Sequence, residues 1–153
     1  MDVLRRAHPR AAWVAVPLLL AALAAAEGLR ALPETEFLLL PPLAVVAYIV
    51  FREPFGPAAT FRSVIAMPVI GATIGALAFR FFAHSALGVA LALVAVLLAQ
   101  KALRAHMPPA LALAVLAIVL RVSGPTYVLG VAEASAFVGI ALLAWRLMLR
   151  ERS

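Results

Sequence analysis

Six apolar runs, separated by short charged or proline-containing breaks, dominate the sequence and restrict what the chain can fold into. They are Ala11–Leu29, Phe37–Phe51, Phe61–Phe82, Ser85–Leu103, Pro108–Leu120 and Thr126–Leu149. A helix needs about 20 apolar residues to cross a hydrocarbon core of about 30 Å. With 66% hydrophobic and only 13% charged residues, the chain also has too few polar side chains to cover a water-facing surface. We therefore predict an all-α membrane protein with about six transmembrane helices, forming a single transmembrane domain over residues 1–153.

The distribution of Lys and Arg predicts the orientation of these spans. With six spans, ten of the 13 basic residues lie on the side that holds both termini, and three lie on the opposite side. The positive-inside rule then places both termini in the cytoplasm, which in a bacterium makes this a protein of the inner membrane. A four-span arrangement with re-entrant short runs has the same orientation. The net charge of +6 does not indicate nucleic-acid binding, because the arginines lie singly or in pairs between apolar runs.

An internal repeat is the second organising feature. Three elements of the first half return 67 or 68 residues later: Pro41-Pro42 as Pro108-Pro109, Gly56-Pro57 as Gly124-Pro125, and Gly71 as Gly139. The two repeats cover about residues 11–83 and 84–149, with three spans each. An odd number of spans inverts the second repeat relative to the first, which is the arrangement typical of secondary transporters. The alternative is chance self-alignment of Ala/Leu/Val-rich sequence.

The second and fifth runs are too short to cross the membrane as regular helices, and both begin near a proline pair. Matched short spans of this kind are the best sequence indicator of a transporter's substrate site. Proline fits the first turn of a helix, so Pro41, Pro42, Pro108 and Pro109 indicate helix N-termini. Unpaired N–H groups and the helix dipole bind anions at such ends. The alternative is that these prolines only shorten the spans and set loop angles.

The third run carries two further backbone signals. Pro68 in its middle predicts a kink, because the proline ring crowds the carbonyl of Val64. Gly71 and Gly75 form a GxxxG pattern that permits close helix packing. We expect this pattern to pack on the small residues of the sixth run within the same chain; a dimer seam is the alternative.

Two ionisable residues are candidates for a functional role. Glu133 lies inside the last apolar run, where a carboxylate is costly and by default a functional candidate, here for carrying a proton. The alternative is a shallow position with an arginine partner. His106 lies at the entry to the fifth run and can titrate near neutral pH or donate to an anion; the alternative is a solvated cap. The sequence has no cysteine, its three histidines lack metal-ligand spacing, and no catalytic motif occurs. We expect neither an enzyme nor a resident metal or cofactor.

Five motifs then carry a resemblance to a known family. They are Pro42…Phe51, Pro54…Pro57, Arg62-Ser63-Val64-Ile65 leading into Gly71, His106-Met107-Pro108-Pro109-Ala110 and Gly124-Pro125-Thr126-Tyr127. With them, the segment from Pro41 to Leu149 resembles the HPP family of small bacterial and plastid integral membrane proteins. The family's His-Pro-Pro motif has a Met inserted here, and its Arg-Asn pair stands as Arg62-Ser63. The resemblance adds Arg62 and Tyr127 to the candidate substrate-binding residues. Because some plastid relatives are associated with nitrite transport, it also implies a nitrite-like substrate.

The sequence as a whole therefore predicts a membrane transporter or channel for a small inorganic anion. Its expected partners are the lipid bilayer and that anion. The alternative is a structural or accessory membrane subunit that does not transport and that forms homo-oligomers.

Overall fold

The computed structural model describes residues 40–122 and 124–150, and all regular secondary structure in these residues is helical. The expected first span, residues 11–29, lies outside them. The elements are α2 (Leu40–Arg52), the 3₁₀ helix η3 (Pro57–Ala59), the π-helical turn η4 (Arg62–Ala66), α3 (Met67–Phe82), α4 (Ala86–Leu103), α5 (Pro109–Val119) and α6 (Pro125–Arg150). Each described α-helix falls on one of the apolar runs to within a few residues, and η3 lies in the break between the second and third runs. The four breaks within the described residues were therefore predicted correctly.

Three helical stretches of the described residues are long and apolar enough to cross a membrane. They are Arg62–Phe82, which joins η4 to α3, Ala86–Leu103 and Pro125–Leu147. The helices α2 and α5 have 13 and 11 residues, which corresponds to about 17–20 Å. The expectation of a short fifth helix is confirmed, whereas α2 begins at the first described residue, so the expectation of a short second helix stays a prediction. The arrangement of six spans in two inverted repeats stays a prediction.

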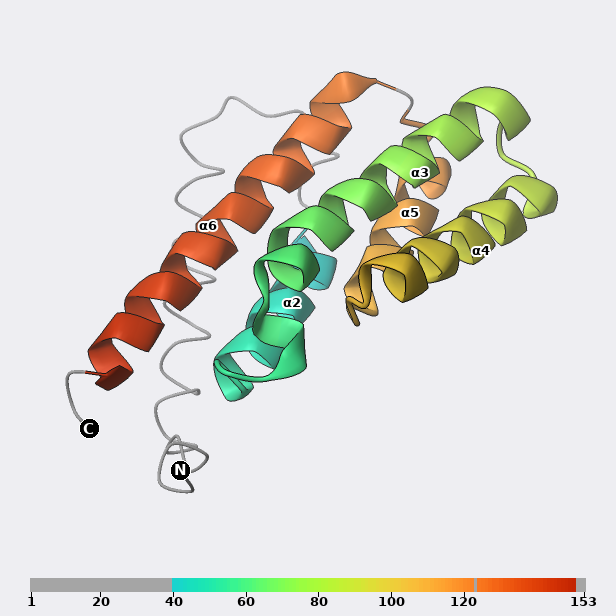
Figure 1. Ribbon diagram of the computed structural model, residues 1–153. Helices are drawn as coiled ribbons and strands as arrows, with labels where there is room; N and C mark the ends of the chain where they lie inside the picture. The colour runs from blue at the N-terminus through green and yellow to red at the C-terminus, as the bar shows by residue number, and fades with distance from the viewer. Residues whose placement is uncertain (1–39, 123, 151–153) are drawn as a thin grey trace.

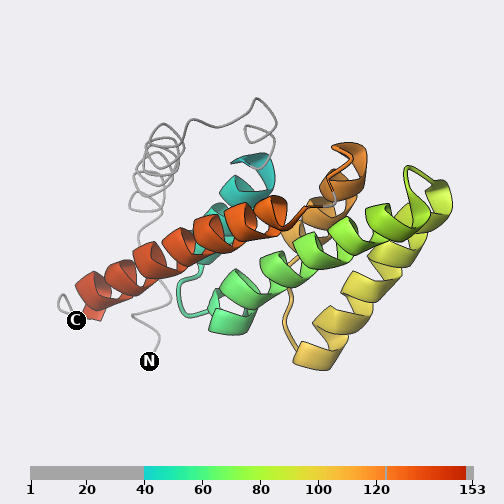
Figure 2. The same ribbon diagram turned by 90° about the horizontal axis from the view of Figure 1, so that it is seen from above.

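The helix α3 is central, since it packs against α4, α5 and α6. Figure 1 shows α6, α3 and α4 in front, with α2 and α5 behind them. The view from above in Figure 2 places α2 and α5 on the same side of the α3–α6 pair. The two short helices also contact each other. The fold therefore brings α2 and α5 together, although about 60 residues separate them in the sequence.

The chain accommodates Pro68 with a π-helical turn placed directly before it. The N–H of Met67 donates to the carbonyl of Arg62, five residues earlier, and Pro68 follows as the second residue of α3. At that position its missing N–H is not required. A π turn inserts one extra residue into a helical turn and is one of the identifiable causes of a helix irregularity. The kink expected at Pro68 stays a prediction, and the helix continues through the π turn from Phe61 to Phe82.

The helices α4 and α5 end in the same way. Arg104 after α4 has φ 49° and Arg121 after α5 has φ 57°, both in the left-handed region. The N–H of Ala105 then reaches back to the carbonyl of Gln100, and the N–H of Val122 to that of Ala117. This C-terminal motif satisfies carbonyls that have no partner within the helix. Both helices therefore stop at the basic breaks of the sequence.

Candidate functional site

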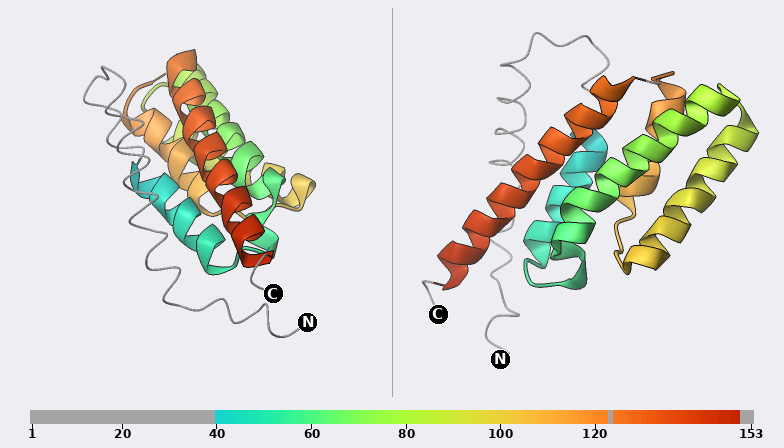
Figure 3. Two further views of the ribbon diagram at one scale, coloured as in Figure 1. Left: turned by 90° about the vertical axis from the view of Figure 1, so that its left-hand side faces the viewer. Right: turned by 45° about the horizontal axis from the view of Figure 1, so that its top comes forward.

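The start of α5 is buried inside the helix bundle. The buried Gln100 of α4 donates its Nε2–H to the carbonyl of Met107 at 2.9 Å, which brings the connecting segment back alongside α4. The right-hand view of Figure 3 shows this segment running along the bundle before α5 begins. Met107 is fully buried. The amide of Gln100 therefore ties the segment that leads into α5 to the last turn of α4.

The prolines at this start have different environments. Pro108 is exposed and is the N-cap residue, whereas Pro109 is buried and is the first residue of α5. The prediction that Pro109 begins the helix is confirmed. The N–H of Ala110 donates to the carbonyl of Met107 and the N–H of Leu111 to that of Pro108, both at 3.0 Å. The first N–H groups of α5 are thus bonded to the turn that precedes them.

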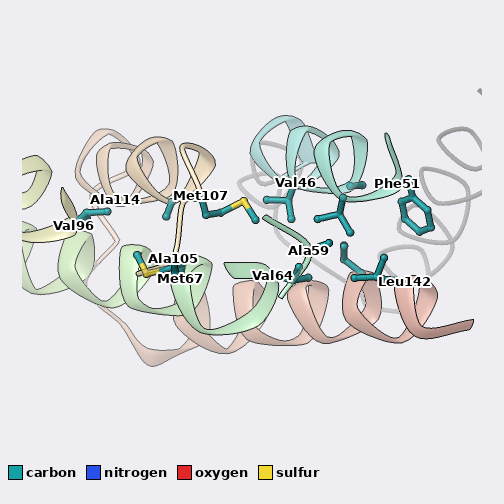
Figure 4. Close-up of a cluster of buried hydrophobic side chains, with 14 of the residues drawn as sticks. Val46, Phe51, Ala59, Val64, Met67, Val96, Ala105, Met107, Ala114 and Leu142 are labelled. Atoms are coloured by element: carbon teal, nitrogen blue, oxygen red, sulfur yellow. The ribbon is translucent and has the colours of Figure 1, made fainter. Parts of the chain in front are cut away.

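The short helix α2 passes this start in the opposite direction. Val46 and Ala47 of α2 belong to the same buried cluster as Met107 and Ala110, and Figure 4 shows Met107 beside Val46. One turn earlier in α2, Leu43 belongs to a second cluster with residues in the middle of α5. Pro41 and Pro42 lie in the first described turn of α2. The start of α5 therefore lies beside the middle of α2, and the first described turn of α2 lies beside the middle of α5.

Tyr127 connects α6 to α5 through its hydroxyl group. It is buried, and its OH donates to the carbonyl of Leu113 at 2.6 Å. Because that carbonyl belongs to the middle of α5, the bond holds the short helix against α6. The structure thus brings one residue singled out by the family resemblance, Tyr127, next to the overlapping pair of short helices.

Three other candidate residues have exposed side chains on three different segments. Arg62 is in η4, His106 is in the connection between α4 and α5, and Glu133 is on α6. Of these, His106 is adjacent in sequence to Met107 and so lies closest to the start of α5. The roles assigned to Arg62, His106 and Glu133 stay predictions. Among the described residues, no three His, Asp, Glu or Cys side chains gather into a group that could hold a metal ion.

The glycines of α3 pack on α5, and the prediction that they face the last helix is wrong. A Cβ at Gly71 would collide with the carbonyl oxygen of Ala110, and one at Gly75 with that of Ala114. The backbone of α5 therefore lies directly against α3, as the GxxxG pattern permits. The contact is within one chain, as expected. The partner differs because α5 also offers alanines at a spacing of four residues.

Arg146 is a residue that the sequence analysis counted only as a topology signal. Its Nε–H donates to the carbonyl of Pro54 at 2.6 Å, and an Nη2–H donates to the carbonyl of Ala59. The guanidinium also lies 5.6 Å from the centre of the Phe55 ring, within range of a cation–π interaction. Arg146 therefore fixes the connection between α2 and α3 to the end of α6. No local pattern reveals such a contact, because its partners are 87 and 92 residues away.

The family model described as HPP, transmembrane region, matches residues 3–153. No curated protein and no solved structure matches the chain.

Proposed function

The chain belongs to the HPP family of integral membrane proteins, and from this premise we propose that it is a transporter or channel for a small inorganic anion. It acts without enzymatic chemistry, and a nitrite-like ion is the substrate that the family resemblance favours. The proposal includes six spans in two inverted repeats, a place in the bacterial inner membrane and cytoplasmic termini.

The observation that carries the proposal is the overlap of α2 and α5 inside the bundle. Both helices are short as described. One proline pair lies in the first described turn of α2, and the other lies at the N-terminus of α5. The two helices contact each other and run in opposite directions. In secondary transporters, half-helices of this kind direct their positive N-terminal ends at the anionic part of the substrate. An N-terminus carries about half a positive charge. The site binds the anion without a buried arginine.

In this proposal, the hydrogen bonds at the start of α5 decide whether its N–H groups are available to an anion. Ala110 and Leu111 donate to the carbonyls of Met107 and Pro108, so the site is closed to an anion. Binding requires these carbonyls to turn away, and the N–H groups then donate to the anion. Gln100 holds the carbonyl of Met107 and therefore opposes this opening. The same turn carries His106, which we assign to guiding the anion, while Glu133 carries a proton.

A specific observation favours the alternative, an accessory subunit that does not transport and that forms homo-oligomers. The residues around the start of α5 are apolar and tightly packed: Met107, Ala110 and Leu113 are fully buried. An apolar, closely packed helix start suits a purely structural helix, because an ion at this place would have no water around it. Flux measurements distinguish the two functions.

The test is anion flux into proteoliposomes that contain the purified full chain, screened over nitrite, nitrate, formate and chloride. Pro109→Ala releases the fixed φ and lets α5 begin about one residue, or 1.5 Å, away. Since errors near 1 Å in a functional site are costly, we expect flux to fall several-fold while the protein still folds. The matched control is Pro125→Ala, which removes an exposed proline from the first position of α6 and should leave flux unchanged.

A second variant distinguishes the helix terminus from a loop cation. Arg104 is exposed in the turn after α4, so Arg104→Ala should lower flux only at low salt, because an exposed charge acts by screened steering. Loss of flux at high salt in Arg104→Ala, with normal flux in Pro109→Ala, would show that the helix terminus is not the binding group. If the wild-type chain transports none of the four ions, the accessory function replaces the proposal.

A further inference from the structure

A pocket of about 320 Å³ lies between α6 and the segment that leads into α3. Its walls include Val64 and Ile65 on one side and Gly139 and Leu143 on the other, with Arg146 at one end. Gly139 has no side chain, and a Cβ there would lie 2.9 Å from Cδ1 of Ile65. The missing side chain therefore helps to leave this space open.

The pocket extends from a membrane boundary towards the centre of the bundle. Its α6 lining runs from Ala136 to Arg146, and ten residues of helix correspond to about 15 Å. Arg146 is one residue from the end of the apolar stretch Pro125–Leu147. The charged end of the pocket is therefore at the boundary, and its apolar end is among hydrocarbon-spanning helices.

The rim of the pocket is apolar and outward-facing. Phe61, Ile140 and Leu143 line it and are 73%, 67% and 58% exposed. All three belong to helices that are long and apolar enough to span a membrane or lie directly beside one. Such a rim faces lipid acyl chains, because water does not enter the hydrocarbon region to cover it.

Arg146 is positioned to bind an anion at this boundary. A guanidinium has five N–H donors in a rigid fork. Two of them donate to the carbonyls of Pro54 and Ala59, which fixes the orientation of the group. Within the described part of the chain, the hydrogen bonds found leave the remaining donors of Arg146 for a ligand. The oxygens of a phosphate group are acceptors that such a preoriented guanidinium binds well.

We propose that this pocket binds one anionic phospholipid, with an acyl chain along Val64, Ile65 and Gly139 and the phosphate on Arg146. Charge complementarity at the boundary selects the headgroup, as basic pockets between transmembrane helices do. Without the acyl chain, the walls of this space lack van der Waals contacts on one side and lose dispersion energy. The acyl chain supplies these contacts. The bound lipid holds α6 against η4. This site is separate from the overlap of α2 and α5 and does not depend on anion transport.

The test measures lipids retained by the purified full chain. Protein in detergent micelles is titrated with dioleoylphosphatidylglycerol or dioleoylphosphatidylcholine, and native mass spectrometry counts the lipids bound. We expect one phosphatidylglycerol to be retained in preference to phosphatidylcholine. Arg146→Gln should weaken this retention about five-fold. The control Arg80→Gln, which changes an exposed arginine at the end of α3, should leave it unchanged. Glycerol 3-phosphate as a competitor separates headgroup-only binding from lipid binding, and only the whole lipid should bind.

A second variant tests the pocket without changing Arg146, whose loss also frees two carbonyls and can unfold the chain. Ala136→Phe places a ring in the apolar end of the pocket and should abolish preferential retention. The matched control, Ala90→Phe on the exposed face of α4, should retain the lipid. Normal retention in Ala136→Phe overturns the proposal. So does competition by glycerol 3-phosphate alone. A cross-link from Ile140 to residues 11–29 or to a second copy overturns it too, since another occupant then fills the pocket.

Discussion

Gly71 and Gly139 stand 68 residues apart at matching positions of the two halves, yet the structure uses them differently. A Cβ at Gly71 would meet the backbone of α5, whereas a Cβ at Gly139 would meet the end of the Ile65 side chain. Backbone cannot move aside without moving a helix, but a side chain can change rotamer. The contact between α3 and α5 is therefore rigid, and the contact between α6 and η4 is adaptable.

The surroundings of the two contacts agree with this difference. Ala72, Ala110 and Ala114 around the α3–α5 contact are fully buried. A pocket of about 320 Å³ opens beside Gly139, where the arginine at the end of α6 bonds to loop carbonyls. Glycines that the predicted repeat aligns thus do not have matching packing. What lies opposite each glycine decides how much freedom the helix pair retains.

Substitution of the two glycines by alanine tests the comparison and should give the largest effect. Gly71→Ala forces α3 and α5 apart, and overpacking of a filled interior costs about 1–3 kcal/mol. We expect a loss of about 2 kcal/mol in the free energy of unfolding, measured by SDS titration in mixed micelles. Gly139→Ala should cost well under 1 kcal/mol, because Ile65 can move into the adjacent pocket. Equal losses in the two variants would contradict the distinction between a rigid and an adaptable contact.

The helix positions were predictable because the residues that end helices are local. Ser85 caps α4 by accepting a hydrogen bond from the N–H of Gly88, and Pro109 and Pro125 are the first residues of their helices. Such signals act within a few residues, so the sequence predicts them. The partner of the α3 glycines was not predictable. Alanines on α5 and small residues on α6 are equally suitable, and only the assembled bundle decides between them.

Tyr127→Phe tests how strongly α6 contributes to the rigid side of the molecule. The variant removes the hydrogen bond from a buried hydroxyl to the carbonyl of Leu113. A bond of this kind between membrane helices is worth about 1 kcal/mol, and we expect that loss in the same SDS titration. The matched control is Tyr48→Phe on the exposed face of α2. Its hydroxyl accepts only a long, solvent-exposed bond of 3.4 Å from Arg52, so the change should have no measurable effect. If both variants lose the same stability, the bond to Leu113 has no special role in holding α5.

Gln100→Leu should have a similar but smaller effect on stability and a clearer effect on position. The carbonyl of Met107 loses its 2.9 Å donor, but it still accepts the N–H of Ala110. We expect a loss of about 0.5–1 kcal/mol. Faster hydrogen exchange at Ala110 and Leu111 should accompany it, since the turn before α5 is released. Lys101→Leu, at the exposed neighbouring position, is the control. Unchanged exchange at these two amides in Gln100→Leu would show that Gln100 does not position the start of α5.

The candidate site was only partly predictable for a related reason. Pro109 and Tyr127 carried local or family signals, and both lie where α5 meets its neighbours. Gln100 and Arg146 carried none. Each acts through a hydrogen bond to a backbone carbonyl, and any residue type can supply that acceptor. An amide or arginine in an apolar helix indicates that some acceptor exists, but the fold alone determines which one.

The smallest effects on stability are expected for two buried serines, one in η4 and one in α6. Ser63 of η4 is buried and bonded, since its hydroxyl accepts from Thr60 at 3.0 Å and lies 3.5 Å from the carbonyl of Pro57. Ser135 of α6 is equally buried, but among the described residues its hydroxyl has no hydrogen-bond partner. Ser63→Ala should therefore lower the free energy of unfolding by about 0.5–1 kcal/mol, whereas Ser135→Ala should be neutral or slightly stabilising, because it removes an unsatisfied polar group.

Nitrite flux measured for the same two variants shows whether either hydroxyl takes part in transport. If Ser135→Ala keeps its stability but loses flux, the hydroxyl is retained for the transported ion, and the adaptable side of the molecule takes part in transport. If it keeps both, Ser135 is only a small buried residue of α6.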